Sequence, residues 1–115
     1  MAPPVFITEM SKMMRPSIAM NDDFIVRINE DADKMYFLHS GYVEVLCRNN
    51  FSPLMYLGKG AYFGEIGCLL TGKRSVSVRA KSNSVIYYVL SHEIIKLLKK
   101  FPEQMNFLKG VAMQR

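Results

Sequence analysis

The chain has 115 residues, of which 50% are hydrophobic and 22% charged, and its formal net charge is +5. This length and composition predict one globular domain, residues 1–115, with a single hydrophobic core, and exclude a disordered chain. No apolar run reaches the roughly 18 residues of a membrane-spanning helix, and the first residues lack a secretory signal pattern.

The basic residues are scattered along the chain instead of forming a dense block with interleaved aromatic residues. A nucleic-acid surface is therefore the weaker interpretation, whereas a mild positive field suits an anionic small ligand or the inner face of a membrane. We expect no nucleic acid among the partners.

Residues 1–16 form the first predicted element, an amphipathic helix. Phe6, Met10 and Met13 recur at helical spacing, and Pro16 is expected to end the helix. Short apolar runs separated by polar or glycine-containing turns follow between residues 22 and 90, and these predict antiparallel strands. The individual strands are expected at residues 24–28, 35–38, 42–47, 54–57, 75–80 and 85–90.

The strand at residues 75–80 alternates strictly between apolar and polar side chains. Val76, Val78 and Ala80 share one face, which should be buried, and the polar side chains, Ser77 among them, take the other. Many short strands at close spacing are typical of an antiparallel barrel or jelly roll.

Two helices are predicted after the strands, within residues 91–115. Ser91 is the expected N-cap of the first, and Pro102 suits the first position of the second. In the last helix Met105, Leu108, Ala112 and Arg115 fall on one side, and we expect the end of the sequence to truncate this helix. The fold class is therefore α+β: an antiparallel β-barrel or jelly roll of about eight short strands, with one N-terminal and two C-terminal helices.

Metal and nucleophile chemistry has little support in the sequence. Cys47 and Cys68 match no metal or redox spacing, and we expect buried free thiols in a reducing compartment. His39 and His92 are far apart, and neither has a ligand partner at metal-binding spacing. We expect no catalytic residues, no metal site and no enzyme activity.

A glycine followed by a carboxylate stands out after Tyr62. Gly64 would let backbone N–H groups approach an anion closely, and Glu65 can accept hydrogen bonds from a ribose hydroxyl. Taken alone, a barrel turn with an exposed glutamate explains this pair better.

Arg74 favours the ligand-binding interpretation of Gly64 and Glu65 over a simple barrel turn. A planar guanidinium can hold two phosphate oxygens at once, which lysine cannot do. Gly64, Glu65, the pair Leu69-Leu70, Arg74 and the alternating strand that follows occur here in one order. Together they predict a site for a cyclic phosphate and its ribose.

The segment from Tyr62 to Ala80 resembles the phosphate-binding cassette of cyclic nucleotide-binding domains, with the cassette proper at residues 62–78. The likeness extends over nearly the whole chain. Lys34 to Leu38 and Ser40 to Leu46 look like the second and third strands of that domain, and His92 to Arg115 looks like its last two helices. Within the superfamily the chain is most similar to hyperpolarisation-activated and other cyclic nucleotide-gated channels.

The resemblance implies a role for each matching residue. The backbone of Gly64, Ile66 and Gly67 would surround the ligand. Glu65 would bond the ribose 2′-hydroxyl, Arg74 would pair with the phosphate, Ser75 would bond the phosphate through its hydroxyl, and Arg115 would cap the purine. The expected ligand-binding residues are Val45, Met55, Phe63, Gly64, Glu65, Ile66, Gly67, Arg74, Ser75, Val76 and Arg115.

The resemblance also implies a function. The domain would bind cAMP or cGMP as a ligand, without a cofactor, and pass the binding event through its C-terminal helix to an attached effector. A transmembrane cation channel is the expected effector, so the domain would be a cytoplasmic part of a membrane protein that can form homo-oligomers. Ser75 replaces the threonine of many channels and Val76 the usual alanine, so the choice between cAMP and cGMP stays open.

Three alternatives stay open on the sequence. The same module could serve a kinase, an exchange factor or a sodium/proton exchanger. It could be an orphan interaction domain whose pocket is filled by its own chain, although Glu65 and Arg74 argue against this. It could also belong to a DNA-binding regulator with a basic recognition helix beyond Arg115.

Overall fold

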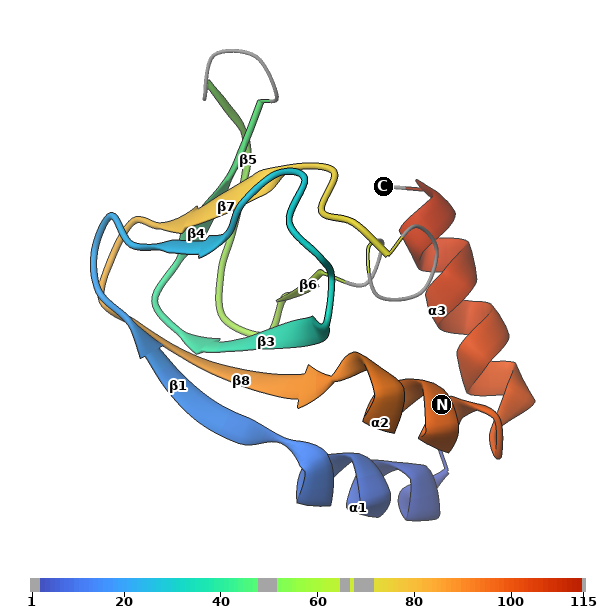
Figure 1. Ribbon diagram of the computed structural model, residues 1–115. Helices are drawn as coiled ribbons and strands as arrows, with labels where there is room; N and C mark the ends of the chain where they lie inside the picture. Colours follow the sequence, from blue (N-terminus) through green and yellow to red (C-terminus); the bar gives the residue numbers. More distant parts are fainter. Residues whose placement is uncertain (1–2, 48–51, 65–66, 68–71, 115) are drawn as a thin grey trace.

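The computed structural model describes residues 3–47, 52–64, 67 and 72–114, with the backbone alone at 108, 109 and 111–114. Two antiparallel four-stranded sheets form its centre, with one helix before them and two after (Figure 1). The helices are α1 (Pro4–Met13), α2 (Ser91–Leu98) and α3 (Pro102–Gln114). The described strands are β1 (Arg15–Ala19), β2 (Phe24–Val26), β3 (Lys34–Ser40), β4 (Val43–Leu46), β5 (Pro53–Leu57), β6 (Tyr62–Phe63), β7 (Ser77–Ala80) and β8 (Ser84–Leu90).

The strand order is β1-β8-β3-β6 in one sheet and β2-β7-β4-β5 in the other. All pairings within these sheets are antiparallel, and neighbours in the sheet are often distant in sequence, as in the pair β1 and β8. The predicted antiparallel barrel with flanking helices is confirmed. Within the described part of the chain, no helix is both long and apolar enough to span a bilayer.

Two hydrophobic clusters hold these elements together. The first fills the space between the sheets and consists of Val26, Tyr36, Leu38, Val43, Phe63, Val78 and Ile86. The second joins the helices to the end of the barrel and consists of Phe6, Met35, Val89, Ile94, Leu97 and Leu98. Phe6 of α1 meets Phe101 edge-to-face at 5.3 Å between ring centroids, so the N-terminal helix is anchored on the C-terminal helices.

The N-terminal helix is shorter than predicted. It ends at Met13 instead of Pro16, and Arg15–Ala19 forms the strand β1, which the sequence analysis missed. The residue before a proline is biased towards extended backbone, which explains the change at Arg15. Proline is tolerated within β1 because this strand is an edge of its sheet.

An ion pair fixes the junction between β1 and α2. The Arg15 guanidinium donates from Nη1 and Nη2 to the two carboxylate oxygens of Glu93, at 2.7 and 3.3 Å. This hydrogen-bonded contact raises the pKa of Arg15 and lowers the pKa of Glu93. Both groups therefore stay charged at neutral pH, and the pair orients α2 against the edge strand.

Three smaller predictions also need correction. Ser91 is the first residue of α2 and not its N-cap, because β8 runs directly into the helix and Leu90 takes the cap position. Ser77 is buried at 3% exposure, since its Oγ accepts a hydrogen bond from the Ile28 N–H at 2.9 Å. Cys47 is a half-buried free thiol instead of a fully buried one, and Cys68 lies outside the described residues.

Candidate ligand-binding site

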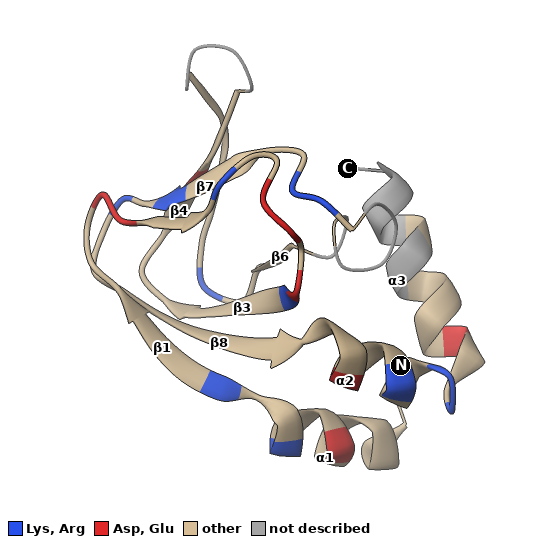
Figure 2. Ribbon diagram, in the orientation of Figure 1, with Lys and Arg blue, Asp and Glu red and all other residues tan. Residues whose placement is uncertain are grey.

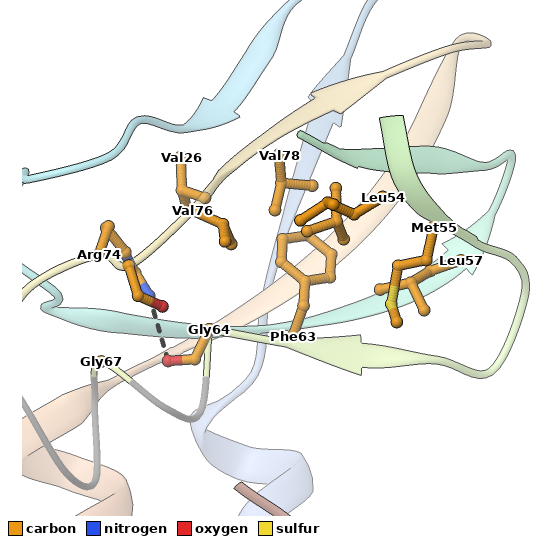
Figure 3. Close-up of a pocket in the computed structure, with 12 residues that line it drawn as sticks. Val26, Leu54, Met55, Leu57, Phe63, Gly64, Gly67, Arg74, Val76 and Val78 are labelled. Atoms are coloured by element: carbon orange, nitrogen blue, oxygen red, sulfur yellow. Dashed lines mark hydrogen bonds between the residues drawn. The ribbon is translucent and has the colours of Figure 1, made fainter. Parts of the chain in front are cut away.

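A cavity of about 160 Å³ opens on the inner face of the sheet β2-β7-β4-β5, beside β6 (Figure 3). Its described lining residues come from five strands, β2, β4, β5, β6 and β7, and from the segments that follow β6 and precede β7. They are Val26, Val45, Leu54, Met55, Leu57, Phe63, Gly64, Gly67, Arg74, Ser75, Val76 and Val78. The structure thus brings every described member of the predicted ligand-binding set to one cavity.

Strand register explains the apolar wall of this cavity. Four side chains from neighbouring strands lie in one row across the sheet: Val26, Val78, Val45 and Met55. Because alternate side chains of a strand share a face, this row points inwards as a unit. The wall is therefore a direct consequence of the pairing β2-β7-β4-β5.

The strand β5 adds an exposed part to the wall. The pairing of β4 with β5 shifts between Val45 and Leu46, so Leu54 is an extra residue on β5. Such a bulge redirects a side chain, and here both Leu54 and Met55 reach the cavity. Leu54 is 60% exposed and Met55 49% exposed, which leaves apolar surface that a flat ring could cover.

Arg74 is the only charged residue among the described residues that line the cavity. It is 5% exposed, and its guanidinium donates hydrogen bonds to the carbonyl oxygens of Gly64 at 3.1 Å and Lys34 at 2.8 Å. The guanidinium carbon also lies 5.6 Å from the ring centroid of Tyr36. These contacts fix the planar group beside the cavity, as Figure 3 shows for the bond to Gly64.

The same guanidinium connects the cavity to the start of α2. Lys34 begins β3 and pairs with Leu90, the last residue of β8. The next residue along, Ser91, donates its backbone N–H to the Asp33 carbonyl at 2.8 Å. A movement of Arg74 would therefore act on the backbone that positions the first turn of α2.

Two glycines allow the backbone to pass close to Arg74 and Ala32. Gly64 has a φ of +88°, and a Cβ there would lie 2.8 Å from Arg74 Nη1 and 3.2 Å from the Lys34 carbonyl oxygen. A Cβ at Gly67 would lie 2.5 Å from the Ala32 Cβ. No other residue type fits these positions without displacing a neighbour.

Replacing Gly64 by alanine should destabilise the domain and displace the Arg74 guanidinium. The left-handed backbone alone costs about 1–2 kcal/mol for a residue with a Cβ. Gly60→Ala is a matched control, because Gly60 has a φ of +89° and open space around the new Cβ. Urea unfolding should show a larger loss for Gly64→Ala than for Gly60→Ala, and equal losses would contradict the proposed contact with Arg74.

Three predicted site residues, Glu65, Ile66 and Arg115, lie outside the described residues, as do Leu69 and Leu70. Their roles stay predictions. Four described lining residues were not predicted from the sequence: Val26, Leu54, Leu57 and Val78. Val78 could have been found, because it shares the apolar face of the strand predicted at residues 75–80 with Val76.

Among the described lining residues, the arrangement combines an apolar wall with one fixed cation beside it. Such a cavity suits an amphipathic anion that has a flat apolar part and a compact negative group. Within the described residues, no cluster of histidine, cysteine and carboxylate side chains could hold a metal ion.

Comparison with known proteins agrees with this chemistry. The family profile of the cyclic nucleotide-binding domain matches residues 19–101. The chain is 36% identical to the potassium/sodium hyperpolarization-activated cyclic nucleotide-gated channel 2 of Mus musculus and to channel 4 of Homo sapiens, and 35% identical to channel 1 of Oryctolagus cuniculus. Each match covers 99% of this chain but only 13%, 9% and 13% of the respective relatives, so the chain spans a small part of their length.

Proposed function

The chain belongs to the cyclic nucleotide-binding domain family, and we propose that it binds cAMP or cGMP in the cavity beside Arg74 and transmits binding to an attached effector. A domain of this family is a ligand-binding module and not an enzyme. The observation that carries the proposal is the buried guanidinium of Arg74 beside the apolar wall, the one charged side chain among the described residues that line the cavity.

In the proposed complex the cyclic phosphate lies against Arg74. The two carbonyl contacts of Arg74 leave further N–H groups of the guanidinium for phosphate oxygens. Ser75, next along the chain and exposed, would add its hydroxyl. The backbone of Gly64, Ile66 and Gly67 would surround the phosphate, and Glu65 would accept a hydrogen bond from the ribose.

The base would cover the apolar wall, in contact with Val45, Met55, Phe63 and Val76. Covering the exposed parts of Leu54 and Met55 removes apolar surface from water, which favours binding of a flat ring. Arg115 of the last helix would close over the purine. Ligand would then favour the state in which this helix lies against the cavity, which is a population shift.

The effector is proposed to be a cation channel, since the relatives named above are channels. The domain would then lie on the cytoplasmic side of a membrane protein, which can assemble as a homo-oligomer. The hydrogen bond from Arg74 to Lys34, next to the start of α2, supports a mechanical connection between ligand and helices.

Calorimetric titration with cAMP and cGMP tests the binding proposal. We expect saturable heat with at least one of them. The response to 5′-AMP and 5′-GMP, whose phosphates are not cyclised onto the ribose, should be clearly weaker. The ratio of the two affinities identifies the preferred messenger. If folded protein gave no heat with either cyclic nucleotide, the proposal would be wrong.

A further inference from the structure

A second hollow, a groove of about 720 Å³, lies between α1 and α2, outside the ligand-binding cavity. Figure 1 shows these two helices side by side beneath the barrel. Leu97 is buried in the floor of the groove, Met13 and Phe101 are half-buried, and Val5 is 62% exposed at its edge. The remaining lining residues are charged or polar: Glu9, His92, Glu93, Lys96 and Lys100.

The two carboxylates of the groove are already neutralised within the chain. Glu9 pairs with Lys12 at 3.1 Å, and Glu93 pairs with Arg15 at 2.7 Å. Among the described residues, no carboxylate forms an ion pair with Lys96 or Lys100. Figure 2 shows both signs of charge on α1 and α2, but these internal pairs leave the rim of the groove with an excess of positive charge.

Lys96 and Lys100 are four residues apart on one side of α2 and the turn that extends it. Like charges at this spacing repel one another and oppose helix formation. Two carboxylates from a partner, spaced in the same way, would remove this repulsion. The apolar floor between the helices would receive the side chains next to those carboxylates.

We propose that this groove binds an acidic amphipathic helix of a partner protein. Apolar residues of that helix lie on Leu97, Met13 and Phe101, and two carboxylates four residues apart face Lys96 and Lys100. When a helix binds in a groove, its contact residues recur three or four positions apart, which matches the spacing of Lys96 and Lys100. An anionic membrane fits less well, because the apolar floor is recessed between the helices.

The probe for a test is a synthetic helical peptide with leucines along one face and two glutamates four residues apart beside them. Its partner peptide carries lysines in place of the glutamates. By fluorescence anisotropy with the whole chain, we expect the acidic peptide to bind about tenfold more tightly than the lysine peptide, because only the acidic peptide can form two exposed ion pairs with Lys96 and Lys100. The amide resonances that shift should belong to α1 and α2 and not to the cavity.

Charge reversal supplies the decisive comparison. The variant Lys96→Glu with Lys100→Glu should prefer the lysine peptide. The double variant Lys59→Glu with Lys99→Glu is the matched control. Both lysines are exposed and lie outside the groove, and their replacement changes the net charge by the same amount as the Lys96 and Lys100 variant. The control should keep the preference for the acidic peptide.

Three results would overturn the proposal. One is equal binding of the two peptides to the unchanged chain, and another is an equal change in preference for the two double variants. The third is binding to phosphatidylserine vesicles that depends on Lys96 and Lys100 without any binding of the acidic peptide. Circular dichroism verifies that both double variants are folded.

Discussion

Replacing Arg74 by alanine should abolish measurable binding of cAMP and cGMP at concentrations that saturate the unchanged domain. The substitution removes the only charged side chain among the described residues of the cavity and leaves the phosphate of the ligand unpaired in an apolar site. Truncating one partner of such a buried charge pair costs about 2–5 kcal/mol. Calorimetric titration of both proteins measures the difference directly.

The controls separate a loss of binding from a loss of fold. Arg74 also donates to the carbonyls of Gly64 and Lys34, so thermal melting of Arg74→Ala must be recorded beside the titration. Arg74→Lys keeps the charge but not the planar fork, and should bind with intermediate affinity. Arg27→Ala removes an exposed arginine that stacks on Phe24 outside the cavity, and should bind normally. Binding by folded Arg74→Ala within twofold of the unchanged domain would contradict the assignment.

Much of the candidate site was predictable from the sequence, because binding a phosphate needs particular residue types, here an arginine and a glycine, in a particular order. Among the described residues, a buried arginine and a glycine with a positive φ occur where the order of the motif placed them. Val45 and Met55 came from the resemblance alone, and the structure places them in one row across β4 and β5. Leu54 was not predictable, because it reaches the cavity through a bulge that depends on the partner strand.

The fold was predictable at the level of class but less so at its edges. The alternation of residues 75–80 correctly predicted that Val78 faces inwards. It also placed Ser77 on the polar face, whereas the Ser77 hydroxyl is buried and accepts a hydrogen bond from the Ile28 N–H. The strand β1 was missed because Pro16 was read as a helix end, while the pairing with β8 that makes it a strand is distant in sequence. The two residues of β6 carry too little pattern to predict a strand.

The outer face of the sheet β2-β7-β4-β5 carries a second row of aligned side chains, which does not touch the cavity. These are Phe24, Arg79, Glu44 and Tyr56. Glu44 is only 2% exposed, and Arg79 donates from Nε and Nη2 to its Oε1 at 2.9 and 2.5 Å. The Arg79 guanidinium also lies 5.6 Å from the Phe24 ring centroid. Arg79 therefore neutralises a buried carboxylate and covers it from solvent.

Arg79→Ala should lower the free energy of unfolding by about 3–5 kcal/mol, because it leaves the buried Glu44 carboxylate without its counterion. Since the Arg79 side chain is 29% exposed, water can reach the truncated site in part, and the lower end of that range is expected. Urea unfolding at neutral pH measures the loss. Ligand affinity, measured where the variant is fully folded, should change little, because Val45 and Val78 on the opposite face still line the cavity.

Two comparisons show whether burial of the pair causes this effect. Lys81→Ala removes the same charge from the exposed pair of Lys81 with Asp22, so it should cost a small fraction of the loss seen for Arg79→Ala. Replacing both partners, Glu44→Leu with Arg79→Met, should restore most of the stability, because no buried charge is left unpaired. If Arg79→Ala cost no more than Lys81→Ala, the pair would be a surface feature, and the register of β4 with β7 would have to be stabilised by the inward-facing valines alone.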